Sequence, residues 1–431
     1  MSSKVPIDQL AQHIGEQVEL RGWLYNKRSS GKIAFLEVRD GSGTVQAVTV
    51  RGKVEPATWE VIETIGQESS LAVTGTVKAD DRAPSGVELV VEAIEVFQAV
   101  EGYPISPKEH GVEFLMDRRH LWLRSAQQHA VLRVRSALQK ICRDYFYERG
   151  YVLFDSPMLT PLSVEGTTTL FETDYFGRSA FLSQSGQLYQ EAGAMAFGKV
   201  FCFGPTFRAE KSKTRRHLTE FWMLEPEIAY ATIDDAMDVA EDFICTVIAQ
   251  ALVECRSELD VLERDLSALE AVQAPFPRLH YDDSVKLLQE AGEEFEWGDD
   301  FGGGHETLLS KHFGKPVFIN RFPARIKPFY MEPDPERDDL VLGCDLIASD
   351  GYGEIIGGGQ RIHDPVLLES KLEEHGLPRE PYEWYLDLRR YGTVPHSGFG
   401  MGLERLVAWV TGRPHLRETI PFPRTIGRLE P

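Results

Sequence analysis

The chain has 431 residues, and 67 Asp and Glu against 46 Lys and Arg give it a formal net charge of −21. This acidic balance argues against a general nucleic-acid coat, because phosphate binding needs concentrated Lys and Arg, although local basic patches remain compatible with a polyanion. A composition of 42% hydrophobic and 26% charged residues is that of a globular protein with two or three domains. No apolar run could span a bilayer and no signal-peptide pattern opens the chain. We therefore expect a cytoplasmic protein without a membrane partner.

Residues 18–97 alternate apolar and polar side chains in five runs, which are separated by turn signals such as Asp40-Gly41-Ser42-Gly43. This alternation is typical of half-buried strands. Five such strands favour a small closed barrel of the OB-fold type, with a β-sandwich as the alternative. We assign residues 1–100 to this domain. Residues 101–125 contain two prolines and no sustained periodicity, so we interpret them as a linker.

Residues 126–431 alternate helix-like and strand-like segments, which predicts an α+β domain. An amphipathic helix is expected to end at Gly150. A second helix is expected to begin at Thr232, because Asp235 follows three residues later as in a capping box. Residues 256–315 are rich in charge and interrupted by glycine, so we expect a peripheral insertion there.

A basic loop between two apolar runs is the first candidate for chemistry. Residues 211–217 contain five basic side chains, and they are flanked by Arg208 and Glu210 on one side and by Phe221 on the other. Guanidinium groups on such a hairpin could make forked contacts with polyphosphate oxygens. For the loop taken alone, a solvated charged surface is the alternative.

Two further segments combine glycines with charged residues. Three glycines at alternate positions precede a helix start: Gly398, Gly400, Gly402 and then Glu404-Arg405. Such glycines let a strand bend or approach its neighbour closely. Upstream, Asp345 and Glu354 lie nine residues apart on neighbouring expected strands, shortly before Arg361. Two carboxylates in this arrangement could share Mg²⁺, although each could also form an ordinary ion pair.

Together these segments resemble the three signature motifs of class II aminoacyl-tRNA synthetases. Motif 1 corresponds to residues 150–160, where the family places a dimer-interface proline, here Pro157. Motif 2 corresponds to residues 207–210 with Phe221, and motif 3 to the glycine series that ends in Arg405. Their order, behind a β-barrel, matches the subclass that charges Asp, Asn or Lys. The resemblance implies a homodimer whose catalytic domain is an antiparallel sheet flanked by helices.

The resemblance also implies how ATP is bound. Arg208 would hold the α-phosphate, Phe221 would stack on adenine, and Arg405 would cover the other adenine face and reach the γ-phosphate. Asp345 and Glu354 would hold Mg²⁺ on the phosphates. The remaining ATP contacts that the family implies are Glu210, His217 and, again, Glu354. The substrate carboxylate would attack the α-phosphorus without a protein nucleophile, and the aminoacyl group would then pass to tRNA.

In the barrel, Arg28, Phe35 and Gln46 lie where the family binds the anticodon. The resemblance implies that Phe35 stacks on the middle uridine while Gln46 hydrogen-bonds it, with Arg28 on the same surface. Stacking combined with contacts to base edges is how OB-folds read single strands. The alternative is that Phe35 is simply part of the barrel core.

The amino-acid pocket of the family aligns with Glu165, Ser185 and Gln187, which would hold the α-ammonium group; capping and turn chemistry is the alternative for these residues. In aspartate enzymes the second segment typically reads Ser-Pro-Gln-Leu-aromatic-Lys-Gln, and its lysine pairs with the substrate carboxylate. Gln190 occupies the position of that lysine here. A buried carboxylate without a cation costs several kcal/mol, whereas a neutral amide avoids this cost.

We therefore predict L-asparagine and tRNA(Asn) as substrates, with ATP and Mg²⁺. Arg361 would donate to the side-chain oxygen and Glu227 would accept from the amide, with Glu225 as the alternative acceptor. The residues around the linker and the Ser-Gly-Gln-Leu segment also resemble the asparaginyl branch of the subclass. The rival hypotheses are an aspartyl enzyme acting on two tRNAs and a synthetase-like enzyme that makes free asparagine, a group that lacks the barrel.

Overall fold

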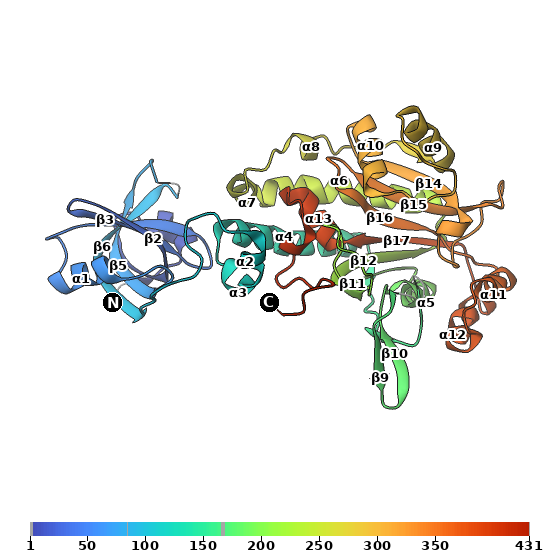
Figure 1. The fold of residues 1–431 in the computed structure, drawn as a ribbon, viewed down its shortest axis with the longest axis horizontal. Helices are drawn as coiled ribbons and strands as arrows, with labels where there is room; N and C mark the ends of the chain where they lie inside the picture. Colours follow the sequence, from blue (N-terminus) through green and yellow to red (C-terminus); the bar gives the residue numbers. More distant parts are fainter. Residues whose placement is uncertain (1–2, 84, 165–168, 431) are drawn as a thin grey trace. The chain divides into compact units, whose positions relative to one another are not determined.

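The computed structural model describes residues 3–83, 85–164 and 169–430 (Figure 1). The chain divides into two compact units, Met1–Gly111 and Val112–Pro431. This boundary lies inside the segment interpreted as a linker, because α2 (Val112–Met116) and α3 (Arg119–Trp122) belong to the second unit. Among the described helices, none combines the length and the apolar character needed to cross a membrane.

The first unit is a closed barrel, as predicted. Its elements are β1 (Ser3–Lys4), η1 (Ile7–His13), β2 (Gln17–Ser30), β3 (Ile33–Arg39), β4 (Thr44–Val50), α1 (Pro56–Thr64), β5 (Ser70–Ala79) and β6 (Val87–Gln98). Strand β2 pairs with both β3 and β5, and β6 joins β4 to β5, so the ring closes. On β3, Ala34, Leu36 and Val38 are buried in the barrel, which leaves the residues between them on the outer face. The sandwich alternative is therefore wrong.

The second unit contains a large mixed sheet in the order β13-β14-β15-β16-β17-β12-β11-β7. Its strands are β7 (Val152–Leu153), β11 (Lys199–Phe207), β12 (Glu220–Ala229), β13 (Arg278–His280), β14 (Val317–Pro323), β15 (Leu340–Ala348), β16 (Gly353–Gln360) and β17 (His396–Gly402). The pairings from β14 to β11 are antiparallel, whereas β13 and β7 add parallel edges. A smaller sheet consists of β8 (Leu159–Thr160), β10 (Arg178–Leu182) and β9 (Glu172–Tyr175).

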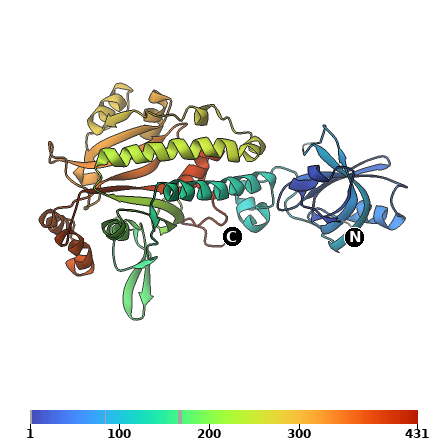
Figure 2. The same cartoon turned by 180° about the vertical axis from the view of Figure 1, so that it is seen from behind.

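The other helices of the second unit pack on its sheets or on one another. They are α4 (Ala126–Glu148), α5 (Gln187–Phe197), α6 (Ile233–Glu254), α7 (Arg256–Val261), α8 (Ser267–Glu270), α9 (Tyr281–Glu290), α10 (Gly303–Phe313), α11 (Pro365–Glu374), α12 (Arg379–Arg390) and α13 (Leu403–Thr411), with the short turns η3 (Ala324–Ile326) and η4 (Leu416–Glu418). Figure 2 shows α4 and α6 side by side across one face. The predicted helix ends are confirmed: Gly150 takes a positive φ of 77° after α4, and Thr232 and Asp235 form the capping box of α6.

Residues 256–315, which we expected to form a peripheral insertion, include one strand of the large sheet. Strand β13 extends the sheet edge in parallel with β14. Tyr281, Val285 and Leu309 form, together with residues of β14, a hydrophobic cluster separate from the main core. Helix α10 also brings Glu306 against Arg216 of the basic loop, with Nη1 and Oε2 at 2.6 Å. The segment therefore reaches the polar side of the sheet that carries the candidate site.

A buried arginine fastens the C-terminal segment to the start of the second unit. Arg119 has no exposed surface, and its guanidinium donates to the carbonyl oxygens of Ile420 and Pro421, both at 2.9 Å. Nη1 also donates to Gln128 Oε1 at 2.6 Å. Because no water can replace these donors, the buried acceptors depend on this side chain.

Replacing this arginine by Arg119→Met should lower the free energy of unfolding by about 3 kcal/mol, because buried carbonyl groups lose their donors. Urea unfolding followed by circular dichroism measures the change. Arg118→Met is the matched control, since that guanidinium donates to the carbonyl of Phe114 one helical turn away in its own segment. Equal losses for the two variants would contradict the assignment.

Candidate active site

Strand β12 places both halves of the candidate site on one face of the sheet. Leu224 and Ile228 point into the core below α4 and α6, so Phe221, Glu225 and Glu227 point to the opposite face. A strand rises about 3.3 Å per residue, which separates Phe221 from Glu227 by roughly 20 Å. The two ends of this face are therefore far enough apart to bind different chemical groups. We call the end at Phe221 the nucleotide end and the end at Glu227 the amino-acid end, after the contacts predicted for these residues.

The nucleotide end is a pocket. It is lined by Arg208, Glu210, Arg216, His217, Leu218, Phe221, Met223, Glu354, Ile355, Gly400, Gly402, Glu404, Arg405 and Leu416. The structure thus brings together every residue predicted to contact ATP, from motifs up to about 200 residues apart in the sequence. The basic loop contributes to this pocket through Arg216 and His217, so it is not merely a solvated surface.

Cations and carboxylates are paired within this pocket. The Arg208 guanidinium carbon lies 5.5 Å from the ring centre of Phe221. Arg405 Nη1 donates to the Glu354 carbonyl oxygen and lies 3.5 Å from Glu354 Oε2. His217 Nε2 lies 3.3 Å from Glu210 Oε2, and this contact holds the pKa of Glu210 below its usual value. These cations are half-exposed, so an anionic ligand can reach them.

Asp345 and Glu354 lie close together beside Gly357. A Cβ atom at Gly357 would stand 2.7 Å from Glu354 Oε1 and 3.4 Å from Asp345 Oδ1, so only glycine leaves this space open. Burial, with Glu354 adding to it, raises the pKa of Asp345 to about 7 against the opposing effect of Lys327. Lys327 Nζ contacts both carboxylate oxygens, at 2.9 and 2.7 Å.

This pair of carboxylates fits Mg²⁺ in the manner of ATP-dependent enzymes, in which one or two carboxylates act together with phosphate oxygens. Within the described residues there is no cluster of three or more His, Cys, Asp or Glu side chains able to hold a metal by themselves. Any ion here would thus need further ligands, which water and substrate phosphates can supply. Lys327 was missed from the sequence, because it belongs to no motif and approaches Asp345 only in the fold.

The other end of the face carries a buried ion pair. Arg361 Nε and Nη2 donate to the two carboxylate oxygens of Glu227 at 3.1 and 3.0 Å, and both side chains are at most 2% exposed. Burial alone would lower the pKa of Arg361, but Glu227 raises it, whereas burial raises the pKa of Glu227 against the opposing effect of Arg361, so each charge depends on its partner. Arg361 Nη1 faces Met331 Sδ at 3.8 Å, a weak acceptor that leaves donor capacity for a ligand.

Glu225 does not share this arrangement. It accepts hydrogen bonds from Ser185 Oγ and, at 2.8 Å, from the Gly186 amide. Glu227 is the carboxylate that lies against Arg361, and its predicted contact with the substrate amide stays a prediction. The predicted contact Glu165 lies outside the described residues.

The start of helix α5 places two glutamines differently. Gln187 Nε2 donates to Glu191 Oε1 at 3.1 Å. Gln190 Nε2 donates to the Phe154 carbonyl at 2.6 Å and to Ser156 Oγ at 2.8 Å. The amide of Gln190 therefore hydrogen-bonds the protein's own backbone and brings no charge to this end of the site.

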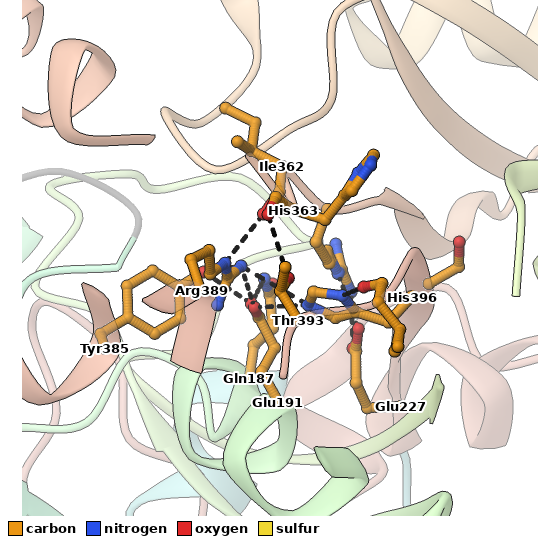
Figure 3. A network of polar contacts seen from close by, with 12 residues as sticks. Gln187, Glu191, Glu227, Ile362, His363, Tyr385, Arg389, Thr393 and His396 are labelled. Atoms are coloured by element: carbon orange, nitrogen blue, oxygen red, sulfur yellow. Dashed lines mark hydrogen bonds and ion pairs between the residues drawn. The ribbon is translucent and has the colours of Figure 1, made fainter. Parts of the chain in front are cut away.

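Glu191 is the centre of a network that the sequence did not reveal (Figure 3). Its carboxylate is fully buried and accepts from Arg389 Nη2 at 2.5 Å and from Tyr385 Oη at 2.8 Å. His396 Nε2 lies 2.9 Å away on the same carboxylate. Together with Gln187, these groups surround both carboxylate oxygens. The partners lie about 200 residues further along the chain, which explains why no local pattern indicated them.

The barrel carries a separate pocket on its outer face. It is lined by Asn26, Lys27, Arg28, Phe35, Glu37, Thr44, Val45, Gln46, Asp80, Arg82, Ala83, Ser85 and Glu88. Arg28 lies over the Phe35 ring at 4.7 Å and donates from Nη2 to Gln46 Oε1 at 3.0 Å. Phe35 is only partly buried, between the core residues Ala34 and Leu36, so it is not part of the barrel core.

Comparison with known proteins accounts for both units. Residues 111–426 match the family described as tRNA synthetases class II (D, K and N), and residues 18–97 match the OB-fold nucleic acid binding domain. The chain belongs to the class II tRNA synthetases. The family and fold predicted from the sequence are therefore confirmed.

Relatives of this synthetase carry a more specific name. The asparagine–tRNA ligase of Chloroflexus aurantiacus is 56% identical over 429 residues, which are 98% of each chain. The asparaginyl-tRNA synthetase of Pyrococcus horikoshii, solved with asparaginyl-adenylate, has a TM-score of 0.97 and 44% identity over the whole of both chains. The corresponding complex from Entamoeba histolytica has a TM-score of 0.91 and 32% identity, again over both whole chains.

The glycine series of the synthetase makes room for its ion pair, which yields a test. A Cβ atom at Gly398 would stand 2.0 Å from Glu227 Oε2 and 2.3 Å from the carbonyl oxygen of Pro226, so Gly398→Ala must displace that carboxylate together with the backbone of β12 beside it. We expect the KM for the amino acid to rise by about 10- to 100-fold, because the pair of Arg361 and Glu227 is then misplaced. These two residues are the predicted contacts of the amino-acid side chain, and we call them the reading pair. Amino-acid-dependent pyrophosphate exchange into ATP measures this change.

Gly204→Ala on β11, two strands away from Gly398 in the same sheet, is the control for that experiment. A Cβ atom at Gly204 meets nothing within 4 Å, so its KM should stay close to that of the unmodified enzyme. If Gly398→Ala left the KM unchanged as well, the Glu227 carboxylate would not be reading the amino acid.

Proposed function

We propose that the chain activates L-asparagine with ATP and transfers it to tRNA(Asn). The observation that carries this proposal is the buried pair of Arg361 and Glu227. A guanidinium donor beside a carboxylate acceptor complements the C=O and NH₂ of an amide, whereas a substrate carboxylate would meet Glu227 as a like charge. The relatives named asparagine–tRNA ligase agree with the sequence-based prediction.

The nucleotide pocket supplies the activation chemistry. Arg208 and Arg405 neutralise charge that develops on the phosphates when the asparagine carboxylate attacks the α-phosphorus, and Phe221 stacks on adenine. His217 binds the terminal phosphates from the basic loop. Asp345 and Glu354 would hold Mg²⁺, which supplies further neutralisation of phosphate charge. Catalysis then rests on positioning and electrostatics, without a covalent intermediate on the protein.

Residues around motif 1 support a homodimer. Pro157 is exposed beside β7, which forms one edge of the large sheet. Large apolar side chains around this edge are 40% to 56% exposed: Tyr147, Val152, Met158, Leu159 and Phe197. Grouped apolar side chains of this kind are typical of a protein interface. We assign this surface to the contact between two copies of the chain.

The first test is pyrophosphate exchange into ATP with asparagine or aspartate as the amino acid. We expect exchange with asparagine and at least about 100-fold less with aspartate, because the carboxylate meets Glu227 without a compensating cation. Arg208→Ala should reduce exchange by at least about 100-fold, since the phosphate charge loses its partner. Equal exchange with aspartate would overturn the proposal.

The barrel is tested separately through charging of tRNA. Phe35→Ala should lower kcat/KM for tRNA by about 5- to 150-fold, which corresponds to the loss of one base stack, and leave pyrophosphate exchange unchanged. Phe97→Ala is the matched control, because Phe97 is 51% exposed on the same barrel and does not line the pocket. A loss of charging that is the same in both variants would contradict a specific stacking role for Phe35.

A further inference from the structure

Glu191 has a complete set of hydrogen-bond donors although it lies behind the amino-acid end of the site. Oε1 accepts from Gln187 and Tyr385 at 3.1 and 2.8 Å, and Oε2 is contacted by Arg389 and His396 at 2.5 and 2.9 Å. Its side chain is fully buried, as is that of Arg389. A carboxylate placed in this way is ionised and rigidly held.

The network is connected to the reading pair by backbone contacts. Arg389 Nε donates to the carbonyl of Ile362 at 2.9 Å, and the amide of Arg361 donates to the carbonyl of His396 at 3.0 Å. Arg389 thus holds Ile362, the residue that follows Arg361, and His396 holds the backbone amide of Arg361 itself. Figure 3 shows Glu191 and Glu227 in the same close-up, with the side chain of His396 between them.

The negative charge of Glu191 also interacts electrostatically with Arg361 of the reading pair. It contributes to raising the pKa of Arg361, in addition to the larger effect of Glu227. The fully buried guanidinium of Arg389 and the imidazole of His396 face Glu191, so its carboxylate compensates the cation of Arg389 directly behind the pocket. In a buried environment, an uncompensated cation at this place would attract a ligand carboxylate.

We propose that Glu191 is a specificity-determining positioning residue, whose negative charge cancels Arg389 and thereby keeps aspartate out of the asparagine site. The inference rests on the proposed activation of asparagine and adds the residue that sets the charge of the pocket. Glu191 does not itself contact the substrate side chain. It acts through the field at Arg361 and Glu227 and through the placement of His396 and Arg389.

The test measures a ratio of two substrates. For Glu191→Gln, the ratio of kcat/KM for aspartate to that for asparagine in pyrophosphate exchange should rise at least about tenfold, because Arg389 loses its counter-charge. Both values come from one preparation, so any loss of folded enzyme cancels in the ratio. Glu191→Met, a second neutral replacement of similar length, should shift the ratio in the same direction.

Two further variants separate charge from structure. Tyr385→Phe removes one hydrogen bond to Glu191 without changing charge, so the ratio should stay within about threefold of the unmodified enzyme. Glu191→Gln with Arg389→Met removes both charges and should bring the ratio back toward the original value.

If both neutral replacements lower exchange with asparagine and aspartate by the same factor, Glu191 is only structural and the inference is overturned. A ratio that stays raised in the double variant also overturns it, because the cation of Arg389 is then not the cause. Failure of the unmodified enzyme to use asparagine would instead contradict the proposed function.

Discussion

The buried pair of Arg361 and Glu227 is the constraint on which the catalytic unit depends. Two full charges at most 2% exposed are tolerated only if each is the other's partner, because breaking such a pair costs several kcal/mol. The pair can form because Gly398 has no side chain at the position that Glu227 Oε2 fills. It is also anchored by β12, whose alternation sends Glu227 to the polar face while Leu224 and Ile228 stay in the core.

Local patterns in the sequence were sufficient to predict the barrel and the ends of two helices in the catalytic unit. Alternation predicted the barrel strands, and the capping residues Thr232 and Asp235 predicted the start of α6. Both depend on residues that are close in sequence. Glu227 and Arg361 are 134 residues apart, and the resemblance to a family assigned both to one pocket but did not indicate that they pair with each other. Phe35 was likewise placed by the resemblance, with the barrel core as the alternative, and the alternation along β3 in the structure puts it on the outer face.

What the sequence could not supply are partners chosen by the fold alone. Glu191 meets Arg389 and His396 across about 200 residues, and nothing around the latter two marks them as its neighbours. Lys327 reaches Asp345 from the turn after β14 for the same reason. Gln190 illustrates the reverse case. Its position was informative because a lysine is missing there, yet its amide is occupied by Phe154 and Ser156.

The two ends of the polar face select their ligands by different physics. At the nucleotide end, Arg405 and His217 are half-exposed and sit beside carboxylates, so a polyanion can exchange for water and for existing partners at modest cost. At the amino-acid end, the two ion pairs that the structure describes, Arg361 with Glu227 and Arg389 with Glu191, are buried and already formed, so neither cation is left over for an added carboxylate. Binding of phosphate thus does not require its cationic side chains to be held in one position. Discrimination between an amide and a carboxylate, in contrast, requires a rigid, charge-balanced pocket. Behind the amino-acid end, the network that extends to Glu191 supplies this charge balance, because Glu191 compensates Arg389 within the protein.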